Sequence, residues 1–336
     1  MSIVSSALLA TLWFVVAPAG AHEVVPADPP DSPDSPGPRR GHALVFDEAR
    51  KVVLLFGGMR ANGEGSPLAD DLLWSFDGRR WSAASRGGGP VAREHANLAY
   101  DAKRRRVVLY GGTTSDADPT KVCDDTWEWD GAKWSQSPAP GPGLRVHSTM
   151  AFDPQRGKVL LFGGFDPKAG KERSDLLEWD GSAWKTIESA PPPTGFAPKL
   201  VGRDAKRPPL LLAVDPKQTE LLAFEWSGRD WSAVGREPPH LLDGAAAWTG
   251  KGGVVVFGGF DGKAMTAATW RLQDGAWTKV EASGPSARGA AALAFDAARG
   301  RAVLYGGASA SDCFADTWEF DGAKWSAVAT TPAGGK

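Results

Sequence analysis

The sequence is poor in cysteine and tyrosine, and it carries almost no net charge. Two cysteines in 336 residues cannot form a disulfide framework or a four-cysteine zinc site. A formal net charge of −2 gives no electrostatic basis for binding nucleic acid, so we expect no nucleic-acid partner. The 41 glycines follow no three-residue period, which excludes collagen, and the 42% of hydrophobic residues excludes a disordered chain.

Long uncharged apolar runs are also missing, except at the N-terminus. Met1–Ala21 has no charged side chain and ends in Ala19-Gly20-Ala21, a pattern that signal peptidases cleave. The run lacks the usual basic residues at its start, and an uncleaved anchor is the alternative. We interpret residues 1–21 as a signal peptide, which predicts a secreted or periplasmic protein with no stable membrane insertion after cleavage. Residues 22–38, rich in Pro and Asp, are expected to be an extended linker.

A tryptophan recurs six times through the rest of the chain, at intervals of 46 to 53 residues. The six are Trp81, Trp134, Trp184, Trp231, Trp277 and Trp325. Seven residues before each of them, and again five residues before, stands a Trp, Phe or Leu. Two apolar residues separated by one position are typical of the inward face of a β-strand. Asp-Gly follows this pair in four repeats and Ser227-Gly228 in the fourth repeat, which predicts a tight hairpin turn with positive φ angles.

Short β-rich runs precede each hairpin and end in Gly-Gly. They are Val52–Phe56, Val107–Tyr110, Val159–Phe162, Val254–Phe257 and Ala302–Tyr305. The fourth repeat is degenerate and has Val214-Asp215 in place of the two glycines. In four repeats an aspartate stands ten residues before the first glycine and closes an earlier strand. Each repeat therefore predicts four strands, which we call A to D, in about 48 residues.

The Gly-Gly after strand B, the aromatic pair in strand C and the tryptophan that opens strand D resemble the kelch repeat. The resemblance covers roughly 290 of the 336 residues and implies an all-β, six-bladed kelch-type β-propeller with four antiparallel strands per blade. The predicted blades span residues 39–86, 93–137, 145–188, 196–234, 241–281 and 288–329, followed by a tail at 330–336. No blade combines both chain ends, so closure of the ring is expected to depend on side-chain packing between blades 6 and 1.

Strand directions alternate, so the B-to-C and D-to-A connections share one face of the ring, here called the loop face. The A-to-B turns and the C-to-D hairpins share the opposite, hairpin face. The B-to-C loops are longest in blades 1 to 3, and long loops on a rigid scaffold usually carry binding groups. We expect a binding patch there that includes Arg60, Glu64, Asp116, Asp118, Lys121, Asp166, Lys168 and Arg173. The alternative for each residue is a solvated loop charge.

Four arginines recur at the start of strand A: Arg39, Arg93, Arg145 and Arg288. Three aspartates, Asp125, Asp175 and Asp316, recur two residues before the first aromatic position of strand C. A residue that recurs in most blades serves the blade, so structural ion pairs are favoured. In kelch relatives such arginines can line the ligand-facing mouth of the channel. The resemblance therefore keeps Arg93, Arg145 and Arg288 as binding candidates.

His95 and His147 share one position in blades 2 and 3, near the channel mouth, and Glu94 adjoins His95. We include all three among the binding candidates. Two imidazoles without a third ligand at a suitable spacing do not predict a metal site, and none is expected. His42 is one residue out of phase and should point to the other side of its strand. Glu94 is a conceivable general acid or base, although a rim charge is the simpler interpretation.

The copper oxidases of this architecture need tyrosines, histidines and a tyrosine-linked cysteine. Tyr100, Tyr110 and Tyr305 stand where other repeats carry Phe, so we expect them in the core and expect no cofactor. Cys123 and Cys313 fall in the B-to-C loops of blades 2 and 6. A disulfide between them would have to cross blade 1, and the sequence leaves this pairing open.

These patterns favour an exported, non-catalytic binding module, expected to be a monomer, that recognises a protein or a glycan through its loop face. The alternative is a carbohydrate-active enzyme, mutarotase-like or isomerase-like, with its site at the channel mouth. Six-bladed periplasmic sialic acid mutarotases resemble this organisation at the level of fold alone. An enzyme needs a concave pocket with convergent polar groups and a strongly shifted pKa, whereas a binding module needs an open rim with aromatic or arginine anchors.

Overall fold

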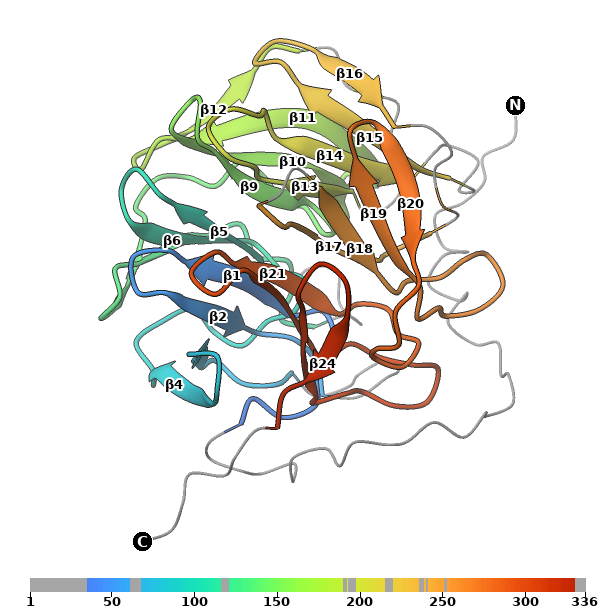
Figure 1. Ribbon diagram of the computed structural model, residues 1–336. Helices are drawn as coiled ribbons and strands as arrows, with labels where there is room; N and C mark the ends of the chain where they lie inside the picture. Colours follow the sequence, from blue (N-terminus) through green and yellow to red (C-terminus); the bar gives the residue numbers. More distant parts are fainter. Residues whose placement is uncertain are drawn as a thin grey trace, which may run out of the picture.

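The computed structural model describes residues 35–60, 68–115, 121–189, 192, 198–214, 220–235, 239, 241–250 and 253–329. These residues form 24 strands in six antiparallel sheets, each built from four consecutive strands. The sheets follow one another around the molecule in chain order, so that the first blade (blue) lies beside the last (red) (Figure 1). The predicted all-β six-bladed propeller is confirmed. Among the described residues, no helix has the length and apolar character needed to cross a membrane.

The strand bounds follow the repeat closely. Blade 1 contains β1 Ala43–Asp47, β2 Val52–Phe56, β3 Leu73–Phe76 and β4 Trp81–Ser85, and blade 2 contains β5 Asn97–Asp101, β6 Arg106–Tyr110, β7 Thr126–Trp129 and β8 Trp134–Gln136. Blade 3 contains β9 Thr149–Asp153, β10 Lys158–Asp166, β11 Lys171–Trp179 and β12 Trp184–Ile187, and blade 4 contains β13 Lys199–Val201, β14 Leu210–Val214, β15 Leu221–Trp226 and β16 Trp231–Val234. Blade 5 contains β17 Ala245–Trp248, β18 Val254–Phe257, β19 Thr269–Gln273 and β20 Ala276–Val280, and blade 6 contains β21 Ala292–Asp296, β22 Arg301–Tyr305, β23 Thr317–Phe320 and β24 Trp325–Ala327. The degenerate fourth repeat thus forms a complete sheet.

The Gly-Gly pair is the joint between neighbouring blades. Both glycines of blade 1 have positive φ, 76° at Gly57 and 100° at Gly58. A Cβ on Gly57 would overlap the Arg93 carbonyl of the next blade, and the Gly58 N–H donates to that carbonyl at 2.9 Å. The joint therefore needs glycine both for its backbone conformation and for the close approach of a second chain segment.

The Asp-Gly hairpins differ from the predicted turn. In blade 1 the turn has four residues, and only Gly78 has positive φ. Asp77 Oδ1 instead accepts the Arg80 N–H at 2.9 Å, so the aspartate caps the turn through its side chain. Among the described hairpins, the two-residue turn with both central φ values positive is found in blade 5, at Asp274-Gly275 (φ 50° and 77°), a turn that the prediction did not include.

The expected long loop of blade 3 is largely β-structure. β10 and β11 are nine residues each and pair beyond the ring as far as Asp166 and Lys171. Asp166 Oδ1 accepts the N–H groups of Lys168 and Ala169, which caps the turn that joins the two strands. The segment that the sequence suggested as an irregular loop is therefore an extended hairpin that projects from the loop face.

Apolar side chains fill the spaces between blades, and the strand-D tryptophans are part of this core. Three of them also donate an indole N–H to a threonine in the preceding blade at 2.9 Å. The pairs are Trp81 to Thr317, Trp184 to Thr126 and Trp325 to Thr269. Tyr110 and Tyr305 are fully buried and Tyr100 is 7% exposed, so the expected core position of the tyrosines is confirmed.

The seam between blades 6 and 1 contains more than the expected side-chain packing. Trp81 packs against Tyr305 with ring centroids 5.0 Å apart. In addition, the Gly307 N–H donates to the Arg39 carbonyl at 2.9 Å, the bond that Gly58 makes at the joint between blades 1 and 2. The Tyr305 hydroxyl donates to the Gly37 carbonyl at 2.9 Å. The last residues assigned to the linker, from Ser35 to Gly37, are buried and belong to the folded ring.

Candidate functional site

Four buried arginines form one repeated unit beside the Gly-Gly joints. Each Nη1 donates to the carbonyl of the first glycine at 2.9–3.1 Å, and each guanidinium pairs with an aspartate. The ion pairs are Arg39–Asp70, Arg93–Asp125, Arg145–Asp175 and Arg288–Asp316, at 2.8, 2.5, 3.0 and 2.5 Å. The expected structural ion pairs of Arg93, Arg145 and Arg288 are thus confirmed, and Arg39 pairs with Asp70, which was not among the recurring aspartates. All four arginines are at most 1% exposed. Ligand contact by Arg93, Arg145 and Arg288 stays a prediction.

In five blades, the residue two positions before strand A lies at the channel mouth and has a left-handed backbone conformation. The positions are Gly41, His95, His147, Asp243 and Ala290, with φ between 49° and 63°. The His95 N–H donates to the Gly41 carbonyl at 2.7 Å, and the Gly41 N–H donates to the Ala290 carbonyl at 3.0 Å. These bonds hold the start of successive blades together. The equivalent places around the mouth then present histidine twice, aspartate once, alanine once and no side chain at Gly41.

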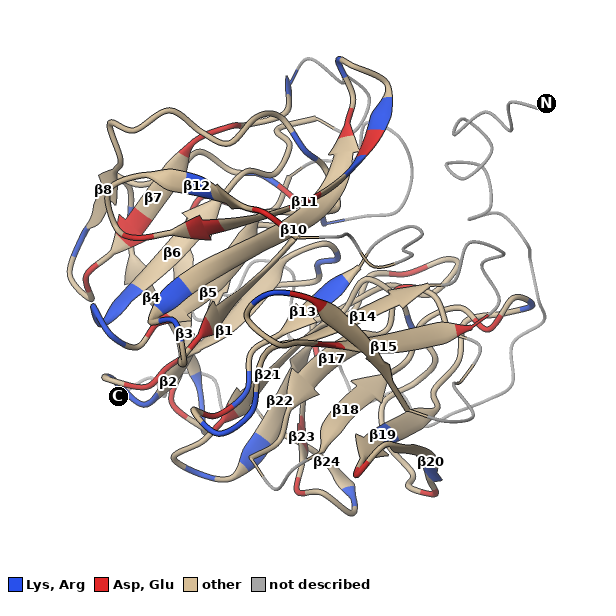
Figure 2. Cartoon of the chain, turned by 90° about the horizontal axis from the view of Figure 1, so that it is seen from above, with Lys and Arg blue, Asp and Glu red and all other residues tan. Residues whose placement is uncertain are grey.

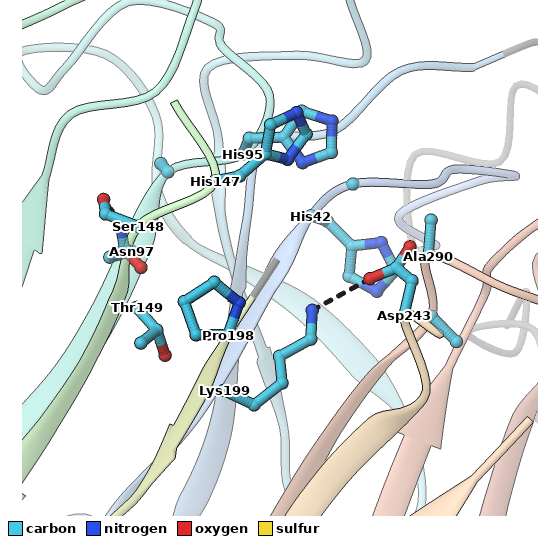
Figure 3. A pocket seen from close by; sticks show the side chains of 13 residues that line it. His42, His95, Asn97, His147, Ser148, Thr149, Pro198, Lys199, Asp243 and Ala290 are labelled. Carbon is cyan, nitrogen blue, oxygen red and sulfur yellow. Dashed lines mark hydrogen bonds and ion pairs between the residues drawn. The ribbon is translucent and has the colours of Figure 1, made fainter. Parts of the chain in front are cut away.

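A cavity of about 130 Å³ lies at this mouth (Figure 3). That is close to the volume of an engineered cavity that holds a benzene ring, ~150 Å³. Its polar lining side chains come from blades 1 to 5 and converge on the channel axis: His42, His95, Asn97, His147, Ser148, Thr149, Lys199 and Asp243. Gly41 and Ala290 place no long side chain in the cavity, so His42 is the long side chain among the lining residues from blades 1 and 6.

His95 and His147 lie side by side at the mouth, with ring centroids 4.7 Å apart (Figure 3). Burial, and then the neighbouring His147, lower the pKa of His95 to about 3. Burial also lowers the pKa of His147 to about 4, although Asp243 opposes that shift. Both imidazoles are therefore neutral at pH 7 and can each donate and accept one hydrogen bond. Buried Glu94 places Oε2 3.3 Å from His95 Nε2.

Lys199 and Asp243 form an ion pair on the other side of the cavity, with Nζ and Oδ1 3.0 Å apart (Figure 3). Burial opposes ionisation of Asp243, but the Lys199 ammonium, and to a smaller extent His95 and His147, hold its pKa below the usual range. The cavity thus has two neutral imidazoles on one side and a charged pair on the other. Asn97 of blade 2 donates from Nδ2 to Ser148 Oγ of blade 3 at 3.0 Å, so the two blades that carry the histidines are also joined by a polar bond.

His42 lies apart from the other two histidines, as its phase predicted. Its ring packs edge-on against Tyr305, with centroids 5.6 Å apart, and the residue is 7% exposed. Burial and the nearby Arg39 lower the pKa of His42 to about 3. This histidine is a neutral core residue that reaches the floor of the cavity.

Several of the proposed loop residues have local partners. Arg173 pairs with Asp166 at 2.6 Å inside the blade 3 hairpin, and Arg60 Nε donates to the Ala69 carbonyl at 3.2 Å. Lys121 and Lys168 are exposed. Glu64, Asp116 and Asp118 lie outside the described residues. None of the described loop side chains, Arg60, Lys121, Asp166, Lys168 and Arg173, lines the cavity.

Cys123 and Cys313 are thiols in the structure, and the disulfide that the sequence left open is not formed between them. Burial raises the pKa of both thiols. Within the described ranges, no three His, Cys, Asp or Glu side chains are grouped so that they could hold a metal ion.

Sequence reasoning missed Lys199 and Asp243. Strand A of blade 5 lacks both the starting arginine and the closing aspartate, and blade 4 lacks the arginine, so neither residue could be phased with His95 and His147 from both landmarks. Counting back from the strand-B glycines does not reveal Asp243 either, since it stands 15 residues before Gly258, whereas His147 stands 16 before Gly163. The one-residue difference is enough to hide the equivalence.

No family model matches the chain. A segment of 134 residues, 38% of the chain, is 30% identical to dynein regulatory complex subunit 7 of Chlamydomonas reinhardtii, and the match spans only 11% of that protein. The solved structure of YjhT superposes with a TM-score of 0.65 at 15% identity, over 88% of this chain and 99% of YjhT. A likeness at that identity is one of fold. The chain is a six-bladed β-propeller with a polar cavity at one mouth of its channel.

Proposed function

We propose that the chain is an exported kelch-type binding module that recognises a glycan, one saccharide unit of which enters the cavity at the channel mouth. The kelch assignment is supported by the repeated joint, in which Gly-Gly, a buried arginine and its aspartate recur together in four blades. The proposal of export is supported by the uncharged N-terminal run and its Ala19-Gly20-Ala21 end.

The observation that carries the proposal is the cavity lining. Neutral imidazoles at His95 and His147, the Lys199–Asp243 pair and the hydroxyls of Ser148 and Thr149 offer donors and acceptors in several directions. Such a mixture suits hydroxyl groups, which need both a donor and an acceptor. The volume suits a single ring rather than a peptide segment.

A panel of free monosaccharides, N-acetylneuraminic acid included, tests this proposal by titration calorimetry at pH 7. We expect binding of at least one sugar to the full-length mature chain and its loss in H147A and D243N. The control is D261N, because Asp261 caps an exposed turn outside the cavity. Equal binding by H147A, D243N and the wild type would contradict the proposal. So would the finding that the chain binds a protein partner and that this binding depends on the loops of blades 1 to 3 alone.

A second candidate is catalysis of sugar interconversion at the same cavity, as in a mutarotase. It is favoured by the strongly lowered pKa values of His95 and His147, which keep two proton acceptors neutral beside the ionised Asp243. NMR exchange spectroscopy of a bound sugar distinguishes the candidates. A module leaves the rate of anomer exchange at its spontaneous value, whereas an enzyme raises that rate and loses the acceleration in H95A without a matching loss of affinity.

A further inference from the structure

The hairpin face carries basic residues of two kinds, and the repeat separates them. Charged residues gather in the turns and connections at the ends of the sheets (Figure 2). One kind recurs with the blade: Arg50, Arg104 and Arg299 each pair with the aspartate that closes strand A, at 2.6–2.7 Å. These arginines are part of the A-to-B turn and need no further explanation.

The second kind is not part of every turn, and it is most frequent in blades 1 and 2. Lys51 and Arg105 end the A-to-B turns of these blades, and Lys103 stands within the turn of blade 2. All three are exposed. In blades 3 and 6, Gly157 and Gly300 stand at the position of Lys51 and Arg105, and Gln155 and Ala298 stand at the position of Lys103. Blade 4 carries an exposed lysine, Lys206, at the Lys103 position. These three cations are therefore additions to the repeat and not requirements of it.

Lys51 and Arg105 stand where the backbone favours glycine. Both have φ 57°, and the glycines at the same place in blades 3 and 6 have φ 62° and 66°. The turn is the same in each case, because Lys51 N–H donates to the Asp47 carbonyl at 2.7 Å, as Gly157 N–H does to Asp153 at 2.8 Å. A long side chain at positive φ is strained, so these two cations are present despite a conformational cost.

The three cations lie on neighbouring blades. Strands β1 and β5, which lead into the two turns, are in contact. The Lys103 side chain reaches across to blade 3, since a Cβ on Gly157 would lie 2.9 Å from its Cδ. Exposed Lys133 lies in the hairpin of blade 2, and Arg50 of the blade 1 turn contacts that hairpin. The acidic side chain beside Lys51 is Glu48, whose carboxyl pKa is raised by burial and by Asp47.

We propose that this patch, formed by Lys51, Lys103, Arg105 and Lys133, is a second binding surface that takes an acidic polysaccharide. Among the described residues the one exposed large hydrophobic side chain is Val91, on the D-to-A connection at the loop face. The patch therefore lacks the aromatic platforms that single-stranded nucleic acids stack on and the apolar groups that enter a membrane. A ligand that binds through its charge alone, and that carries repeated anionic groups, fits this patch best.

Binding of the mature chain to immobilised heparin, with neutral dextran as the blank, tests the proposal. The variant K51G/K103Q/R105G removes three charges and gives two turns the residue found in blades 3 and 6. We expect its affinity at 50 mM salt to fall on the order of tenfold, with a shallower salt dependence. Its Tm should be no lower than that of the wild type, because glycine relieves the positive φ.

The matched control is K171Q/K263Q, which removes two exposed charges from the loop face. Equal heparin affinity in the triple variant and the wild type would overturn the proposal, as would an equal loss in the control. Duplex DNA and phosphatidylserine vesicles serve as competing probes. Tighter binding to either of them than to heparin would overturn the assignment to a polysaccharide.

Discussion

The hydrogen bond across the seam offers a direct test of how the ring is closed. Trp81 and Thr317 are each 2% exposed, and the indole N–H of Trp81 donates to the Thr317 hydroxyl at 2.9 Å. Thr317→Val keeps the shape of the side chain but leaves this N–H buried without an acceptor. A buried donor that loses its partner costs about 1–3 kcal/mol.

The molecule itself indicates that the lower part of this range applies. Trp134, Trp231 and Trp277 are the equivalent tryptophans of blades 2, 4 and 5, and in the described part of the chain their indole N–H groups have no acceptor. The strand-C position that carries Thr317 in blade 6 carries Leu73 in blade 1, Leu176 in blade 3 and Ala223 in blade 4. These three residues lie in the core clusters of Trp134, Trp231 and Trp277, respectively. Since the fold tolerates three such sites, we expect T317V to lose about 1–2 kcal/mol, or roughly 2–8 °C in Tm.

The assay is urea unfolding followed by tryptophan fluorescence, at equilibrium and in stopped flow. T126V and T278V are the controls: Thr126 accepts the same bond from Trp184 inside the ring, and Thr278 is exposed on β20. T126V should lose as much equilibrium stability as T317V, but T317V should unfold faster, because the seam has no covalent connection. A T317V protein as stable as T278V would refute the reasoning.

Three further predictions follow from the site and its supporting ion pairs. Asp175→Ala leaves the buried Arg145 guanidinium uncompensated and should cost about 3 kcal/mol in urea unfolding, whereas a loss below 1 kcal/mol would mean that water replaces the carboxylate. The folded state lowers the pKa of His95 and His147 to about 3 and 4, whereas the unfolded chain has histidine pKa values near 6.5. As the pH falls from 6.5 towards 4, the unfolded state therefore binds more protons than the folded state, and the free energy of unfolding decreases. The urea midpoint should drop over that range, and it should drop less in H95A/H147A. Gly41→Ala places a Cβ 3.2 Å from His95 Cε1 at φ 63°, so it should cost about 1 kcal/mol and weaken sugar binding, and unchanged calorimetric affinity would show that His95 can shift without consequence.

The sequence was most informative where one physical requirement repeats. Apolar alternation and the Gly-Gly joint recur in phase, so β2 and β18 have the predicted bounds. The Asp-Gly hairpins were placed correctly, but their geometry was not predicted, because an aspartate can either adopt positive φ or cap the turn with its side chain. Asp77 caps and Asp274 adopts positive φ, and the dipeptide is the same in both.

The candidate site was predictable only in part, for the opposite reason. His95 and His147 stood out because two neighbouring blades share them. Lys199 and Asp243 come from the two blades that diverge most from the repeat, and only the closed ring brings them to the same cavity. The loop of blade 3 was misjudged because strand pairing continues beyond Gly164 through a register shift, which loop length alone does not reveal.

The likeness of the seam to two joints inside the chain has a consequence for the order of the blades along the chain. The bond from Gly307 to Arg39 at the seam matches the bonds from Gly58 to Arg93 and from Gly259 to Arg288 inside the chain. The contact that closes the ring is therefore of the same kind as the contacts between blades 1 and 2 and between blades 5 and 6. A circular permutant that links the end of blade 6 to the start of blade 1, and opens instead between blades 1 and 2, should therefore fold to the same ring with the same cavity.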